Sequence, residues 1–256
     1  MIATFLLCIV GGVAMALAVS RTDHVTLRWQ RLGAIVALCL LAVAGVTVQV
    51  TEARWSLMAG VALGIALVGT AAHLTLAQLG RRTALRALAG AVLVACVVGA
   101  AALAQNQISA ERVIGPWTLR WVMLLGAGLL GGSVMAMLLG HAYLTAGDEM
   151  TQKPFERLVI MLGVLLVLRA VASGIAWWAW RTDAAEQGAA LMQRMYIIAR
   201  FAVGLGGPMV FTAMAWDCVR RRANQSATGI LYVTIILIII GEGLALVLMD
   251  ATGHAF

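Results

Sequence analysis

Eight apolar stretches, each long enough to cross a lipid bilayer, account for most of this 256-residue chain. A transmembrane helix needs about 20 predominantly apolar residues. Hydrophobic residues make up 62% of the chain and charged residues 11%, whereas a water-soluble domain carries about 25% charged residues. The sequence therefore predicts an all-α integral membrane protein, a bundle of about eight transmembrane helices whose fold forms in lipid.

The predicted spans are joined by short connections, none of which is long enough to fold as a soluble domain, so residues 1–256 form one transmembrane domain. The spans cover Ile2–Ser20, Leu32–Val50, Ser56–Leu79, Leu85–Ala104, Leu119–Leu144, Leu158–Trp180, Met195–Val219 and Ala227–Met249. The first span has no basic segment before it and is longer than the apolar core of a signal peptide, which favours a retained helix. We expect a multi-pass protein of a bacterial inner membrane.

Lysine and arginine are distributed unequally between the two ends of this bundle. Most of the 18 basic residues lie in the connections after the first, third, fifth and seventh spans, for example in Arg81–Arg86 and Arg220–Arg222. Because cytoplasmic loops are enriched in Lys and Arg, we expect these connections to face the cytoplasm and both termini to lie on the other side. The net charge of +7 then reflects anchoring at anionic membrane lipids. A basic face with stacking aromatic residues, which nucleic-acid binding would need, is not found.

Three charged residues lie inside predicted spans, where each costs about 2.5–3.5 kcal/mol on insertion scales. They are Arg169 in the sixth span, Arg200 in the seventh and Glu242 in the eighth. At a rise of about 1.5 Å per residue, they lie within roughly 10 Å of one another in depth. Because the three helices are consecutive and therefore expected to be neighbours, the sequence predicts an Arg169–Glu242–Arg200 cluster with one surplus positive charge.

Two roles are open for such a cluster. It could be an ionic lock that holds three helices together. Alternatively, its surplus charge could bind an electron-rich group, namely a quinone head, a haem propionate, a lipid phosphate or an anionic solute, since the guanidinium fork donates hydrogen bonds in pairs.

His73 and His141 form a second candidate site. Each lies near the cytoplasmic end of its span, within an H-x-x-L sequence. Two neutral imidazoles at one depth on different helices could ligate the iron of haem b, so the pair is a candidate metal site. The alternative is that each histidine hydrogen-bonds separately to a neighbouring helix.

The seventh span contains an unusual run, with Gly204, Gly206, Gly207 and Pro208 close to the middle of the membrane. Such residues weaken or kink a helix. The segment is predicted to be a hinge. It is either a simple packing kink or a broken helix whose freed backbone groups line a site.

Other residues bear on packing rather than chemistry. Gly60 and Gly64, and likewise Gly128 and Gly132, are spaced four apart, which predicts close approach of neighbouring helices. Trp29 lies at a predicted inner end, where tryptophan is typical of the membrane interface.

These patterns favour an integral-membrane subunit of a larger respiratory or redox complex. It would bind quinone or haem b within the bundle, pass electrons to partner membrane subunits and be embedded in lipid. The alternatives are a transporter for a small anionic solute and a non-catalytic structural or assembly subunit. The sequence contains no P-loop, H-E-x-x-H or G-x-S-x-G motif that would favour a self-contained enzyme.

Overall fold

Long helices dominate the computed structural model, which describes residues 1–20, 22, 24–50, 56–107, 114–146, 151–187 and 191–256. In that part of the chain, eight helical segments are long and apolar enough to cross a membrane. Seven of them are α1 (Ile2–Val19), α2 (Leu27–Val50), α3 (Leu57–Gln78), α4 (Leu85–Gln107), α5 (Pro116–Ala146), α6 (Lys153–Gln187) and α9 (Asn224–Thr252). The remaining segment consists of α7 (Leu191–Phe201), the π-helix η2 (Ala202–Gly206) and α8 (Gly207–Arg220). The predicted all-helical class is confirmed.

Local sequence signals explain where several helices begin and end. Pro116 is the first residue of α5, and Pro154 and Pro208 are the second residues of α6 and α8. Proline is tolerated there because the first N–H groups of a helix have no partner within the helix. Ser56 caps α3 by accepting a hydrogen bond from the backbone N–H of Ala59.

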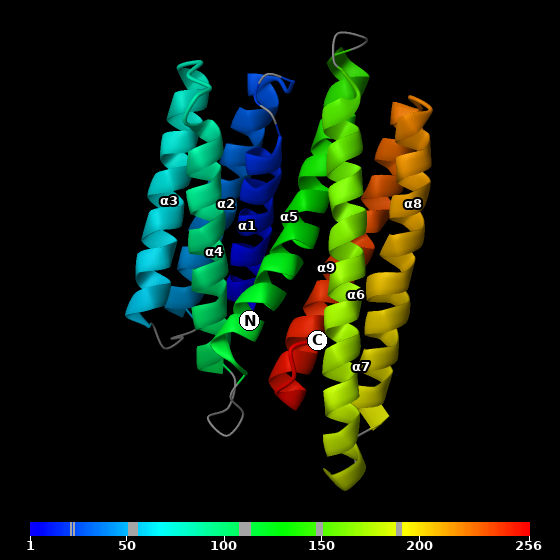
Figure 1. The fold of residues 1–256 in the computed structure, drawn as a ribbon. Coiled ribbons are helices and arrows are strands. Elements are labelled where there is room, and N and C mark those ends of the chain that lie inside the picture. The colour runs from blue at the N-terminus through cyan, green and yellow to red at the C-terminus, as the bar shows by residue number, and fades with distance from the viewer. Residues whose placement is uncertain (21, 23, 51–55, 108–113, 147–150, 188–190) are drawn as a thin grey trace.

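The helices run alternately up and down, and both termini lie toward the same end of the bundle (Figure 1). One group is α1 to α4, in which α1 packs against α2 and α4, and α3 packs against the same two helices. A second group is α5, α6, α8 and α9, with α7 and η2 packed on α9. Contacts of α5 with α1 and with α4 join the groups, so α5 is the central element of the fold.

Glycine sets the distance between α1 and α5. A Cβ atom added to Gly12 would lie 1.8 Å from the carbonyl oxygen of Ala127, and one added to Gly131 would lie 2.1 Å from a carbonyl oxygen of α1. The predicted close approach at Gly64 is wrong, because no atom lies within 4 Å of an added Cβ there. At Gly128 the prediction is confirmed, since an added Cβ would lie 2.7 Å from the Leu165 side chain of α6.

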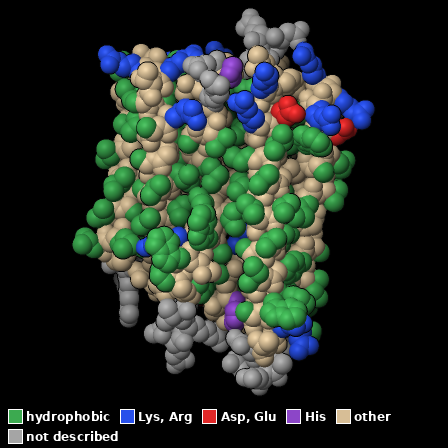
Figure 2. All heavy atoms as spheres, in the orientation of Figure 1, with side chains coloured by type: hydrophobic (Ala, Val, Ile, Leu, Met, Phe, Trp, Pro, Cys, Tyr) green, Lys and Arg blue, Asp and Glu red, His purple; other side chains and the backbone are tan. Residues whose placement is uncertain are grey.

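The surface of the bundle is divided into an apolar middle and a basic end. Hydrophobic side chains cover the middle, and most visible Lys and Arg side chains gather at the end that carries the α1–α2, α3–α4, α5–α6 and α8–α9 connections (Figure 2). This is the end opposite the two termini. The distribution matches that of a membrane-spanning bundle with unequal loop charge.

Trp29 lies in the first turn of α2, near an end of the helix as predicted, but it is buried within the bundle rather than exposed on its surface. Its side chain is 2% exposed, and its Nε1 donates a hydrogen bond of 3.3 Å to the carbonyl oxygen of Met135. The reason is that α2 begins at Leu27, earlier than the expected Leu32. Trp29 therefore faces α5 within the bundle.

Candidate functional site

The structure brings Arg169, Arg200 and Glu242 into direct contact in the interior of the second helix group. Arg169 lies on α6, Arg200 in the last turn of α7, and Glu242 in the second half of α9. These three residues are called the Arg–Glu–Arg cluster below. The predicted ion-pair contact of Glu242 is confirmed with both arginines.

Arg169 binds the carboxylate of Glu242 through two nitrogen atoms. Its Nη2 donates to Oε2 at 2.8 Å, and its Nε lies 3.1 Å from Oε1 and 3.2 Å from Oε2. This two-point contact uses the planar fork of the guanidinium and fixes its orientation as well as its position.

Arg200 binds the other side of the same carboxylate. Its Nη2 donates to Glu242 Oε1 at 2.9 Å and lies 3.5 Å from Ser173 Oγ. Ser173 is one helical turn beyond Arg169 on α6. The cluster thus ties α6, α7 and α9 together at one level.

The side chains of the cluster are almost completely buried. The exposed fractions of the side chains are 3% for Arg169, 0% for Arg200 and 5% for Glu242. Two guanidinium groups share one carboxylate, which leaves a formal surplus of one positive charge. Burying a charge without a partner is strongly unfavourable, so this surplus requires an electron-rich neighbour.

Three guanidinium nitrogen atoms of the cluster have no hydrogen-bond acceptor among the described residues. They are Nη1 of Arg169 and both Nε and Nη1 of Arg200. Buried polar groups in folded proteins are almost always hydrogen-bonded. The unused donors and the surplus charge lie on the same side chains, and both favour a bound oxygen acceptor such as water, an anion or a carbonyl group.

Glycine residues provide the space for the cluster. A Cβ atom added to Gly126 of α5 would lie 2.8 Å from Glu242 Oε2. A Cβ atom on Gly204 would lie 3.4 Å from Arg200 Nη1 and 2.5 Å from the Cα of Gly241 on α9. The backbones of η2 and α9 therefore touch beside the cluster, and any larger residue at Gly204 would separate them.

The predicted hinge at Gly204, Gly206, Gly207 and Pro208 is a π-helical turn rather than a break. The chain stays helical through η2, and the Gly207 N–H donates to the carbonyl oxygen of Ala202, five residues earlier. One extra residue per turn widens the helix without freeing several backbone groups at once. A π-helical turn inside an α-helix often lies at a functional site, and η2 directly follows the turn that carries Arg200.

His73 and His141 are not brought together in comparable surroundings. His73 is buried on α3, and its Nε2 is 3.0 Å from Oε1 of Gln30 on α2. His141 is exposed on α5, a helix that packs mainly on α1, α4, α6 and α9. His73 thus makes the hydrogen bond to a neighbouring helix that the alternative predicted for each histidine, and haem b ligation by the pair receives no support from this geometry.

Several residues of these sites were not anticipated from the sequence. Gln30 was expected in a connection and instead lies buried in α2. Gly126 and Gly241 were not distinguished from the many other glycines of the chain. Ser173 did carry a usable signal, because it lies four residues after Arg169, on the same helix face.

No protein-family profile, curated protein or solved structure matches this chain. The function must therefore be inferred from the residues and their geometry.

Proposed function

We propose that this protein is the integral-membrane subunit of a larger redox complex and that the Arg–Glu–Arg cluster binds the head group of a quinone. The observation that carries the proposal is the set of three buried guanidinium nitrogens, on Arg169 and Arg200, that have no acceptor in the described part of the chain. A quinone carbonyl oxygen accepts such hydrogen bonds. The surplus positive charge of the cluster would also stabilise the negative charge that a quinone gains when it accepts an electron.

The surroundings of the cluster favour a ligand that dissolves in the bilayer. The three side chains are buried within helices whose outer faces are apolar. Quinones reside in the hydrocarbon layer, so they approach a transmembrane site from lipid rather than from water. Reduction to a quinol takes two electrons and two protons. The electrons would come from a partner subunit, since the eight apolar helices occupy most of this chain, and the protons would come from water at the membrane surface.

The proposed orientation places the basic end of the bundle in the cytoplasm. It rests on the gathering of Lys and Arg at the end opposite the termini (Figure 2) and on the positive-inside rule. With this orientation the cluster lies in the outer half of the membrane, and both termini are outside. The membrane would be a bacterial inner membrane.

The quinone proposal is tested by the quinone content of the purified full-length protein. The protein is isolated in mild detergent from membranes that contain quinone, extracted with organic solvent and measured by liquid chromatography and mass spectrometry. Arg200→Gln is the informative variant, because it removes two of the three unused nitrogens and the surplus charge while leaving the two-point contact between Arg169 and Glu242. We expect quinone to be retained by the wild type and lost from this variant.

Arg194→Gln is the matched control, because Arg194 lies on the same helix and is exposed. It should retain quinone at the wild-type level. Equal quinone content in the wild type, Arg200→Gln and Arg194→Gln would contradict the proposal, as would a wild-type protein that neither retains quinone nor binds an added short-chain quinone.

A second candidate function is transport of a small anionic solute, and the π-helix η2 beside Arg200 favours it. A π-helical turn inside an α-helix often lies at a functional site, and this turn directly follows the buried cationic side chain of Arg200. Efflux of anions from proteoliposomes distinguishes the two functions. Flux that is lost in Arg200→Gln, together with unchanged quinone content, would favour transport. A purely structural cluster predicts neither activity.

A further inference from the structure

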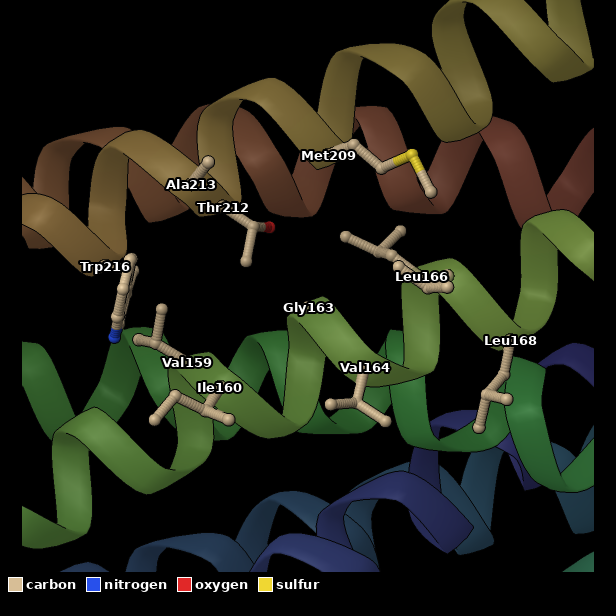
Figure 3. A pocket seen from close by; sticks show the side chains of 11 residues that line it. Val159, Ile160, Gly163, Val164, Leu166, Leu168, Met209, Thr212, Ala213 and Trp216 are labelled. Carbon is tan, nitrogen blue, oxygen red and sulfur yellow. The ribbon is translucent and has the colours of Figure 1, made fainter.

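An apolar groove runs between α6 and α8 on the outer surface of the bundle (Figure 3). Its volume is 590 Å³. Its walls include Ile160, Val164 and Val167 on α6 and Met209, Ala213 and Trp216 on α8. Trp216 lies opposite the Val159–Ile160 turn, so these residues mark one end of the groove (Figure 3).

Two arginines continue the walls of the groove beyond that end. Arg157 precedes Ile160 by three residues and Val164 by seven, which places it on the same face of α6. Arg220 follows Trp216 by four residues on α8, and its guanidinium lies 4.9 Å from the centre of the Trp216 ring. Both arginines are exposed. The groove therefore opens toward a pair of cationic side chains at the basic end of the bundle.

Among the described residues, the charge around this opening is positive. Lys153, Arg157 and Arg220–Arg222 are exposed there, whereas the acidic side chains of the same helix turns are Glu156 and Asp217. Asp217 is already bound to Arg221, with Oδ2 and Nε 2.9 Å apart. Arg157 and Arg220 thus remain available for a negatively charged group.

The length of the groove matches one leaflet of a bilayer. From Val159 to Leu168, the first and last α6 residues of its lining, the helix rises about 14 Å. Half the thickness of the hydrocarbon core is about 15 Å. A lipid whose head group lies at Arg157 and Arg220 would extend one acyl chain along the groove to the middle of the membrane.

We propose that the α6–α8 groove is a binding site for one anionic phospholipid of the leaflet at the basic end of the bundle. Its phosphate lies between Arg157 and Arg220, and one acyl chain lies in the groove. Basic pockets between transmembrane helices are suited to anionic head groups, and the apolar walls exclude a purely water-soluble anion. The site is independent of the quinone proposal.

Native mass spectrometry of the full-length protein in detergent tests this site. The protein is titrated with phosphatidylglycerol and, separately, with phosphatidylcholine. Arg157→Gln combined with Arg220→Gln should weaken the first phosphatidylglycerol bound by about thirtyfold and should weaken phosphatidylcholine binding less, because choline offsets the charge of its phosphate. The control combines Arg28→Gln with Arg81→Gln, which removes two exposed charges from the same end but from α2 and the α3–α4 connection, and should behave as the wild type.

The position of the acyl chain is tested by Gly163→Leu. A Cβ atom on Gly163 meets only the Thr212 side chain, at 4.0 Å, so leucine fits but occupies the groove. It should reduce binding of both lipids, whereas inorganic phosphate should not displace phosphatidylglycerol from the wild type. The proposal is overturned if the Arg157→Gln/Arg220→Gln protein binds phosphatidylglycerol as the wild type does, if the control pair weakens binding equally, or if Gly163→Leu leaves binding unchanged.

Discussion

Glu242→Gln should reduce the free energy of unfolding by about 3–5 kcal/mol, because it removes the carboxylate from between two buried guanidinium groups. The carboxylate accepts hydrogen bonds from Nε and Nη2 of Arg169 and from Nη2 of Arg200. A hydrogen bond to a charged group contributes about 1.5–3 kcal/mol to stability. Loss of two guanidinium partners therefore gives an expected destabilisation of similar size. The substitution also raises the formal charge of the cluster from +1 to +2 without changing the size of the side chain.

Reversible unfolding in mixed micelles of mild detergent and dodecyl sulfate measures this loss. Asp250→Asn is the matched control, because Asp250 is exposed near the end of α9, and it should change stability by less than about 0.5 kcal/mol. Ordinary hydrogen bonds between transmembrane helices contribute about 0.6 kcal/mol on average. A loss below about 1 kcal/mol for Glu242→Gln would place the cluster among those ordinary contacts and refute the charge argument.

A second substitution separates charge from packing. Adding Arg200→Gln to Glu242→Gln returns the formal charge to +1, the value of the wild type. We expect the double variant to recover part of the stability lost in Glu242→Gln. A double variant that is less stable than Glu242→Gln would show that the contacts of Arg200, rather than the charge of the cluster, dominate.

Three further predictions concern the packing and orientation of the bundle. Gly12→Ala should destabilise the protein by about 1–3 kcal/mol through overpacking against α5. Gly64→Ala, whose added Cβ meets no neighbouring atom, should be neutral or slightly stabilising. Equal effects of the two substitutions in the same unfolding assay would contradict the α1–α5 contact. His73→Ala should lower the free energy of unfolding by about 1–3 kcal/mol, because it leaves the buried Gln30 without its partner. His141→Ala should have little effect, and a larger loss for His141→Ala than for His73→Ala would contradict the His73–Gln30 contact. In a cysteine-free background, Gln225→Cys should react with an impermeant maleimide only after cells are opened, and Asp250→Cys should react in cells whose outer membrane has been permeabilised; the opposite pattern would invert the proposed orientation.

The eight spans could be predicted from the sequence because hydropathy over about 20 residues is a strong signal. The Arg–Glu–Arg cluster could be predicted for a related reason. The rise per residue fixes the depth of a charge within a span, and the high cost of isolated buried charge brings opposite charges at one depth together. At the depth of Arg169, Arg200 and Glu242, the predicted spans offer few other charged groups with which these side chains could pair.

The remaining contacts depend on the rotation of each helix, which apolar sequences specify poorly. Gly64 and Gly131 both belong to helices rich in small residues, yet only Gly131 faces another backbone. Lipid and protein interior are similarly apolar, so the hydrophobic pattern does not distinguish the two faces. The pairing of His73 with Gln30 was missed for another reason, because α2 begins within a segment of mixed polarity that was expected to be a connection.

The contact between Gly12 and Gly131 also constrains the order in which the protein is assembled. α1 is made before the other helices described here, but the surface that covers its glycine face is made about 120 residues later. At about 5–20 residues per second, this interval lasts roughly 6–24 s. Throughout it, α1 has no α5 to pack against, and the bare backbone at Gly12 faces lipid or the insertion machinery. The first half of the chain can therefore complete its packing only after α5 has been made, so biosynthesis of this bundle includes a waiting step.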